Sequence, residues 1–177
     1  MGGLGVKADN GSFEQLFTGL YRELRSLAHA RLRRHGAPTL LDTTSLVHES
    51  YLRFLRTGHV QIADQTHFIA YAARVMRSVI VDFAREGAAQ RRGGGEKDVT
   101  LDTGAAAELA GNEREIIRLN DALDELSTVS ERLVRVVEMR YYGGLTDSEI
   151  AEVLNVSERT VRRDWEKAKM ILAAALA

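Results

Sequence analysis

The side chains best suited to bind another molecule are cationic, and they gather near the C-terminus. Residues 157–169 include three arginines and two lysines in a segment whose apolar residues recur with helical spacing. Val161, Trp165, Ala168 and Leu172 would form a buried face, so that the long basic side chains project from the other faces. Such side chains can reach phosphate oxygens and the edges of bases. The pattern predicts a DNA-binding helix with contacts from Ser157, Arg159, Thr160, Arg162, Arg163 and Lys167.

A shorter helix just before this segment would position it. Thr146 and Glu149 have the spacing of a capping box at a helix N-terminus. Asn155 and Val156 then interrupt the apolar pattern, and Ser157 is a favourable N-cap for the next helix. Two short helices joined by a tight turn, the second of them basic, are typical of a helix-turn-helix. The alternative is a plain helical hairpin with a solvated basic face.

The remaining polar residues form no catalytic or metal-binding pattern. The five histidines lack the spacing of metal ligands, and His48-Glu49 lacks the second histidine of a zinc-protease helix. The three glycines at 93–95 are not followed by the Lys-Ser/Thr of a phosphate-binding loop. The chain has no cysteine, which excludes disulfides and thiolate metal sites. We therefore expect no enzyme activity, no metal and no cofactor.

Composition favours a helical protein that acts away from membranes. The chain of 177 residues has one proline, Pro38, and is rich in alanine, leucine, arginine and glutamate. No apolar run approaches the roughly 20 residues of a membrane span, and the N-terminus lacks the apolar core of a signal peptide. We therefore expect a cytoplasmic protein. Although the net charge is −1, residues 1–92 have more basic than acidic side chains and the residues after them have more acidic ones. Contact with DNA would therefore depend on local patches of positive charge.

Three helices are predicted in a first unit, residues 12–92. The first runs over residues 12–34 from a Ser12–Gln15 capping box, and the second begins after Asp42 and stops near Gly58. The residues of the second helix that are expected to point inward are Leu46, Val47, Tyr51, Phe54 and Leu55. The third, about 66–85, has an apolar stripe and an opposite, exposed side that carries Arg74, Arg77, Ser78, Asp82 and Arg85.

The rest of the chain predicts a linker and a second helical unit. Residues 93–112 are glycine-rich, small and acidic, as in a flexible tether. Residues 113–177 would form helices over 113–126 and 131–142, followed by the helix-turn-helix. The predicted fold is all-α, with two small helical domains joined by a flexible linker and a helix-turn-helix at the end of the second.

Three motifs in this order resemble the extracytoplasmic-function class of the sigma-70 superfamily, the promoter-recognition subunits of bacterial RNA polymerase. The second helix carries Asp42-Thr43-Thr44-Ser45-Leu46-Val47-His48-Glu49, where the family has Asp-Ala-Glu-Asp-Leu-Val-Gln-Glu. The third carries Arg74-x-x-Arg77-Ser78-x-x-x-Asp82-x-x-Arg85, where the family has asparagine in place of the serine. The end carries Gly144-Leu145-Thr146-x-x-Glu149-Ile150-Ala151-x-x-Leu154 and then Arg159-Thr160-Val161. The resemblance extends from Phe13 to Ala174.

This resemblance implies two partners, core RNA polymerase and promoter DNA. The unit 12–92 would bind the polymerase clamp and read the −10 element as single-stranded DNA, and the unit 113–177 would dock on the flap and read the −35 element. The residues implied in clamp binding are Asp42, Leu46, His48, Glu49 and Arg53. Those implied at the −10 element, in the third helix and the loop before it, are His59, Arg74, Arg77, Ser78 and Arg85.

The second helix departs from the family pattern in its charge. Thr44 and Ser45 stand where the family has Glu-Asp, acids that meet basic residues of the clamp. Phosphorylation of Thr43, Thr44 or Ser45 would add about −1.5 to −2 charge there and restore the attraction. We therefore hypothesise that a Ser/Thr protein kinase activates the protein. The alternative is that these residues are only a helix cap.

Two further functions share the same pattern. One is a stand-alone helix-turn-helix regulator whose N-terminal bundle senses a signal or dimerises. The other is a polymerase-binding antagonist or adaptor that does not read DNA. Co-purification with core polymerase and promoter-dependent transcription separate the three functions.

Overall fold

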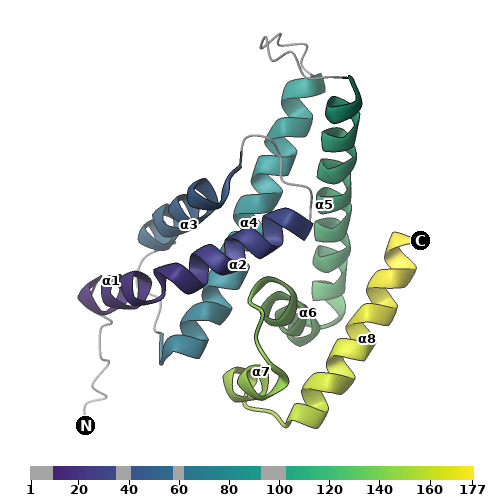
Figure 1. The fold of residues 1–177 in the computed structure, drawn as a ribbon. Helices are drawn as coiled ribbons and strands as arrows, with labels where there is room; N and C mark the ends of the chain where they lie inside the picture. The colour runs from purple at the N-terminus through teal and green to yellow at the C-terminus, as the bar shows by residue number, and fades with distance from the viewer. Residues whose placement is uncertain (1–9, 35–40, 58–61, 93–102) are drawn as a thin grey trace, which may run out of the picture.

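The computed structural model of the chain describes residues 10–34, 41–57, 62–92 and 103–177, and within these ranges every regular element is helical (Figure 1). The all-α class predicted from the sequence is confirmed. The described ranges contain no helix that is both long and apolar enough to cross a membrane. The elements are α1 (Asn10–Gly19), α2 (Tyr21–Arg34), α3 (Thr43–Thr57), α4 (Gln65–Arg92), α5 (Thr103–Val129), α6 (Glu131–Val137), the π-helical turn η1 (Glu138–Tyr142), α7 (Asp147–Leu154) and α8 (Glu158–Leu176).

The first predicted helix is divided in two. It begins at Asn10 rather than Ser12, and it is interrupted between Gly19 and Tyr21. Glycine lowers helix stability within a helix interior, which allows the chain to bend there and to bury Leu20. The α2 segment then packs against α3 and α4. The predicted cap of the second helix is present, since the backbone N–H of Ser45 donates to Asp42 Oδ1 at 2.8 Å.

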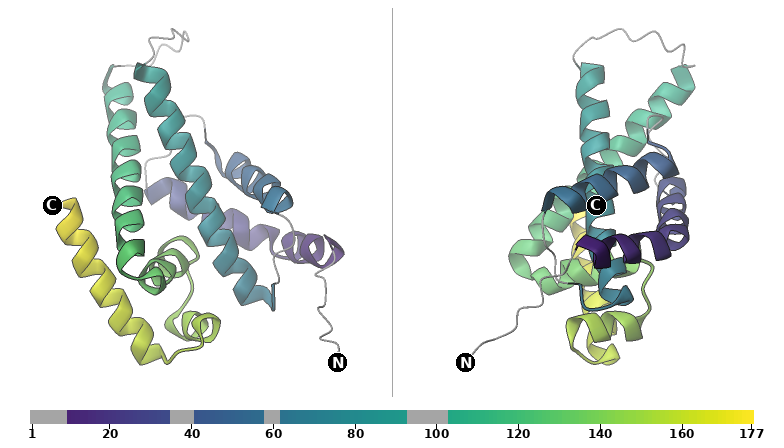
Figure 2. Two further views of the ribbon diagram at one scale, coloured as in Figure 1. Left: turned by 180° about the vertical axis from the view of Figure 1, so that it is seen from behind. Right: turned by 90° about the vertical axis from the view of Figure 1, so that its left-hand side faces the viewer.

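Helix α4 is the central element of the fold. It extends to Arg92, beyond the predicted end at residue 85. Its apolar stripe predicted that other helices would pack on one side of it, but buried residues occur on more than that side. The stripe residues Phe68 and Met76 are buried against α2 and α3, but Ala73 and Ala84 are buried as well. The additional burial arises because α5, η1 and α7 pack along α4 too. Figures 1 and 2 show α5 running between α4 and α8.

The segment predicted as a tether is partly helical. Helix α5 begins at Thr103, ten residues before the predicted start of the second unit at residue 113. Residues 93–102, with their three glycines, lie outside the described residues. The prediction of a linker through residue 112 is therefore wrong for its second half.

A π-helical turn ends the predicted helix over 131–142. The backbone N–H of Gly143 donates to the carbonyl of Glu138, five residues earlier, at 3.0 Å. Gly144 follows with a φ of 66°, a conformation that favours glycine. A side chain at Gly143 would lie 2.6 Å from the carbonyl oxygen of Met139 and 3.2 Å from the Cβ of Ala73. Glycine therefore allows α4 to approach this turn closely.

The C-terminal pair of helices has the predicted caps. Thr146 and Glu149 form the reciprocal capping box of α7, and Ser157 accepts from the backbone N–H of Thr160 at the start of α8. Asn155 closes the turn with a φ of 52°, in the left-handed region where asparagine is tolerated. The order of helix, short turn and helix agrees with the sequence pattern, and its role as a DNA-binding helix-turn-helix stays a prediction.

The two predicted units share one core in this structure. The largest cluster of buried apolar side chains joins Leu24 and Phe68 of the first unit to Met139, Ile150 and Val161 of the second. A smaller cluster lies between α5, α6 and α8, around Leu123 and Leu126. The units therefore pack against each other along α4.

Candidate nucleic-acid interface

Helix α8 presents most of its predicted DNA-binding residues to solvent. Arg159 and Lys167 are exposed, and Arg163 is 70% exposed, with Asp164 Oδ1 at 3.7 Å from its guanidinium. Arg162 differs, because it is held by Asp147 of α7 at 3.2 Å and by Glu158 at 2.7 Å. The Thr160 side chain is half-buried next to Ser157. Arg159, Arg162, Arg163 and Lys167 are therefore all exposed, and Arg162 alone among them is also paired with α7.

The opposite face of α8 fixes the orientation of these cations. Val161, Ala168 and Leu172 are buried as the spacing predicted, and Trp165 is half-buried between the two apolar clusters. The guanidinium of Arg140 lies over the Trp165 ring at 4.9 Å from its centroid, a favourable cation–π contact. Trp165 therefore packs against the rest of the domain, and the basic face of α8 points away from it.

Along α4, the residues predicted at the −10 element divide into two groups. Arg74 and Ser78 are exposed, and Arg85 is half-exposed with an ion pair to Asp121 of α5 at 3.3 Å. Arg77 is buried, with 9% of its surface exposed, so the prediction that it lies on an exposed side is wrong for this arrangement. The sequence pattern predicted the helix but not the second layer, α5, that covers Arg77. His59 lies outside the described residues.

Arg77 is the centre of a polar cluster between α4, α5 and η1. Its Nη1 donates to Glu138 Oε1 at 2.7 Å, and its Nη2 donates to Asn120 Oδ1 at 2.8 Å and to Asp124 Oδ1 at 2.9 Å. Asn120 in turn donates to Asp124 Oδ2 at 2.9 Å. Glu138 is 5% exposed, so its charge is balanced by Arg77 rather than by water.

The residues predicted for polymerase binding lie on α3 with different exposures. Asp42 and His48 are exposed, and Glu49 and Arg53 are half-buried. Leu46 is fully buried in the core, so it positions α3 instead of facing a partner, and its assignment as a contact residue is wrong. Arg53 reaches across to α4, where it donates to Ser78 Oγ at 2.6 Å and pairs with Asp82 at 2.7 Å.

The three hydroxyl residues at the start of α3 differ in access. Thr44 is exposed, whereas Thr43 and Ser45 are half-buried. The backbone N–H groups at this helix start stabilise a negative charge nearby. The hydrogen bond that the Ser45 N–H donates to Asp42 lowers the pKa of Asp42 below its usual value. The first turn of α3 itself contains no acidic residue.

Two exposed leucines on α3 were not predicted as contact residues. Leu52 is 42% exposed and Leu55 is 49% exposed, although the sequence pattern placed Leu55 inward. Together with Thr44 and His48 they follow a helical spacing along the outer side of α3. The signal was available in the sequence, because helical spacing places Leu52 and Leu55 on the side of α3 opposite to Leu46 and Phe54, which are buried.

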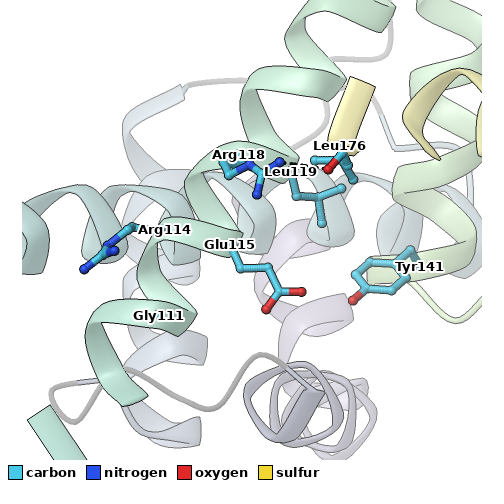
Figure 3. A pocket seen from close by; sticks show the side chains of 7 residues that line it. All are labelled: Gly111, Arg114, Glu115, Arg118, Leu119, Tyr141 and Leu176. Carbon is cyan, nitrogen blue, oxygen red and sulfur yellow. Dashed lines mark hydrogen bonds between the residues drawn. The ribbon is translucent and has the colours of Figure 1, made fainter. Parts of the chain in front are cut away.

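A cavity of about 520 Å³ lies between α5, η1 and the end of α8. Figure 3 shows Arg118 directed toward Leu176 there, and Arg118 Nη2 donates to the Leu176 carbonyl at 2.8 Å. Glu115 and Tyr141 also line the cavity. It brings together none of the predicted site residues. Over the described residues, His, Asp and Glu side chains form no group that could hold a metal ion.

Comparison with known proteins adds the family. The sequence profile of the family described as "ECF sigma factor" matches residues 6–177, nearly the whole chain. The chain belongs to the ECF sigma factor family. No curated protein and no solved structure matches it. As an ECF sigma factor, the chain belongs to a group of regulatory proteins that are not enzymes, and it has a role in transcription initiation.

Proposed function

We propose that this sigma factor binds core RNA polymerase and directs transcription from promoters that carry paired −10 and −35 elements. The observation that supports this most strongly is the face of α8, where Arg159, Arg163 and Lys167 project outward from a buried apolar stripe. A helix anchored in this way can enter the major groove with its basic side chains toward base edges and phosphates.

The outer side of α3 is the proposed polymerase contact. Leu52 and Leu55 offer apolar area at its centre, and Thr44 and His48 extend the surface toward the helix start. Exposed apolar residues bordered by polar ones are typical of protein interfaces. The −10 element would then meet α4 and the loop 57–65, of which residues 58–61 lie outside the described residues.

Phosphorylation of α3 is a further part of the proposal. A phosphate on Thr44 would be stabilised by the positive end of the helix dipole and would supply the negative charge that the first turn lacks. Thr44 is the most accessible of the three hydroxyls, so a Ser/Thr kinase would modify it in preference to Thr43 and Ser45.

Holoenzyme formation is the experiment that tests this function. The purified full chain is mixed with core polymerase, and the complex is isolated by gel filtration with and without a phosphomimetic at Thr44. A sigma factor forms a complex of one chain with one core enzyme. A stand-alone regulator would instead bind duplex DNA in the absence of polymerase, which a separate DNA-binding assay measures. Duplex binding without polymerase, or the absence of any complex with core polymerase, overturns the proposal. An antagonist binds polymerase but supports no promoter-dependent transcription.

A further inference from the structure

A single carboxylate connects the two helices of the C-terminal pair to the turn before them. Asp147 is the first residue of α7, and its side chain is 22% exposed. Its Oδ2 accepts from the Nε of Arg162 of α8 at 3.2 Å, and it is also paired with Arg140 of η1. The guanidinium of Arg140 in turn lies over the ring of Trp165 of α8. Asp147 therefore holds α7 and η1 against the N-terminal half of α8 (Figure 1).

Arg162 differs from the neighbouring exposed cations in the partners of its donors. Its Nε donates to Asp147, and its Nη2 donates to Glu158 Oε2 at 2.7 Å. Carboxylate oxygens and phosphate oxygens are alternative acceptors for the same planar guanidinium. An arginine that is shared between two carboxylates therefore has fewer donors left for DNA than its exposure suggests.

The two carboxylates restrain Arg162 in different ways. Glu158 belongs to the same helix, four residues earlier, and its side chain is 47% exposed. Such a pair moves with α8 and is weakened by water and salt. Asp147 belongs to another helix, is less exposed, and has its own position fixed by Arg140. Asp147 is therefore the partner that ties Arg162 to a point outside α8.

We propose that Asp147 is a specificity-determining residue, which holds Arg162 against α7 and so keeps this cation from contacting DNA of any sequence. This inference rests on the proposed role of α8 in reading the −35 element. Contacts to phosphate add affinity for every sequence, whereas contacts to base edges require a fixed geometry. Asp147 favours base contacts in two ways, because it occupies Arg162 and because it holds α8 in place against α7.

The packing of α8 itself does not depend on Asp147. Val161 is fully buried in the core, and the buried carboxylate of Asp164 accepts from the Nε of Arg132 of α6 at 2.6 Å. These contacts keep α8 on the domain when the surface pair with α7 is lost, since pairs between partly exposed charges add little to stability. Neutralising Asp147 should therefore free Arg162 without unfolding the C-terminal helices.

The first test measures how holoenzyme with Asp147→Asn binds two promoters, one with a matched and one with a mutated −35 element, over a range of salt concentrations. One additional phosphate contact steepens the dependence of log affinity on log salt by about 1 and raises affinity about fivefold near physiological salt. We expect both effects on the mutated promoter. On the matched promoter the rise should stay below about twofold, because a less firmly held α8 loses part of its base contacts.

Two comparisons accompany this variant. Glu152→Gln removes a charge from an exposed acid of the same helix and should leave the salt dependence unchanged. Asp147→Ser is a second neutral variant, and it should behave as Asp147→Asn does. Urea denaturation of each full chain shows that it is folded. A salt dependence that neither Asp147 variant changes overturns the proposal.

The second test asks whether Asp147 acts through Arg162. Asp147→Asn is combined with Arg162→Ala, and the pair is compared with Arg162→Ala alone. We expect the two to have the same salt dependence and the same preference for the matched promoter, because no cation is left to be freed. A steeper salt dependence in the double variant would mean that Asp147 acts only by its own charge, which overturns the proposal. Equal binding of both promoters by the unaltered holoenzyme would instead contradict the proposed reading of the −35 element.

Discussion

Arg77 of α4 and Glu138 of η1 form an ion pair of 2.7 Å between two side chains that are 11% and 7% exposed. The two residues are 61 positions apart in sequence and belong to different predicted units. Their pairing explains why Arg77, which the sequence pattern predicted on an exposed side of its helix, is buried in this structure. It also identifies the turn after α6 as one of the places where the C-terminal unit contacts the N-terminal one, beside α5 and α7.

Trp165 is expected to contribute to stability rather than to DNA binding. It is half-buried between two apolar clusters, with Arg140 over its ring. Trp165→Ala should lower the free energy of unfolding of the full chain by about 2–3 kcal/mol, below the value for a fully buried tryptophan. Urea denaturation measures this loss, and Trp165→Phe, which keeps an aromatic ring, should recover part of it. A change below about 0.5 kcal/mol would mean that the side chain is not packed.

Leu46 and Leu52 are six residues apart on α3, on different sides of the helix, and should behave differently. Leu46 is fully buried, so Leu46→Ala should lower the free energy of unfolding by about 2–5 kcal/mol. Leu52 is 42% exposed, so Leu52→Ala should change stability by less than about 1 kcal/mol. Only the Leu52 variant should bind core polymerase more weakly while remaining folded. Equal polymerase affinity of the Leu52 variant and the unaltered chain would place the docking surface elsewhere.

Charge at the start of α3 should increase polymerase binding. Thr44→Glu adds a carboxylate at an exposed position where the helix dipole favours it. We expect the variant to bind core polymerase more tightly than the unphosphorylated chain, and Thr44→Gln, which has the same length without charge, to leave binding unchanged. Thr43→Glu and Ser45→Glu should act more weakly, because both side chains are half-buried. If the unphosphorylated chain already binds as tightly as Thr44→Glu, phosphorylation is not the switch.

Arg159 and Arg163 should dominate recognition of the −35 element. Both are exposed, whereas Arg162 is held by Asp147 and Glu158. Holoenzyme carrying Arg159→Ala or Arg163→Ala should lose about 1–3 kcal/mol of promoter binding, the usual value for a base-edge contact. Arg162→Ala should have a smaller effect on binding. Filter binding with matched and mutated −35 sequences measures the difference, and unaltered affinity of both the Arg159 and Arg163 variants would exclude α8 as the reading helix.

The sequence predicted local features better than the packing between units. The capping box of Thr146 and Glu149 and the N-cap Ser157 depend on residues three positions apart, so their spacing alone indicates them. The stripe of Val161, Ala168 and Leu172 is likewise a property of one helix.

Features that depend on distant residues could not be predicted in the same way. Arg77 looks like a surface residue in its own helix and becomes buried only through Asn120 and Glu138, more than 40 residues away. The early start of α5 at Thr103 had no cap or stripe to indicate it, since its first residues are small. The interruption at Gly19 was visible as a glycine, but many helices tolerate one.

Run-off transcription with core polymerase and a library of promoter sequences tests the central claim most directly. The account predicts that the full chain, unmodified or with Thr44→Glu, gives transcripts from promoters that share two separated sequence elements, and that Arg159→Ala relaxes the preference at the upstream element alone. Transcripts that do not depend on the added chain, or no transcripts with either form of the chain, would contradict it.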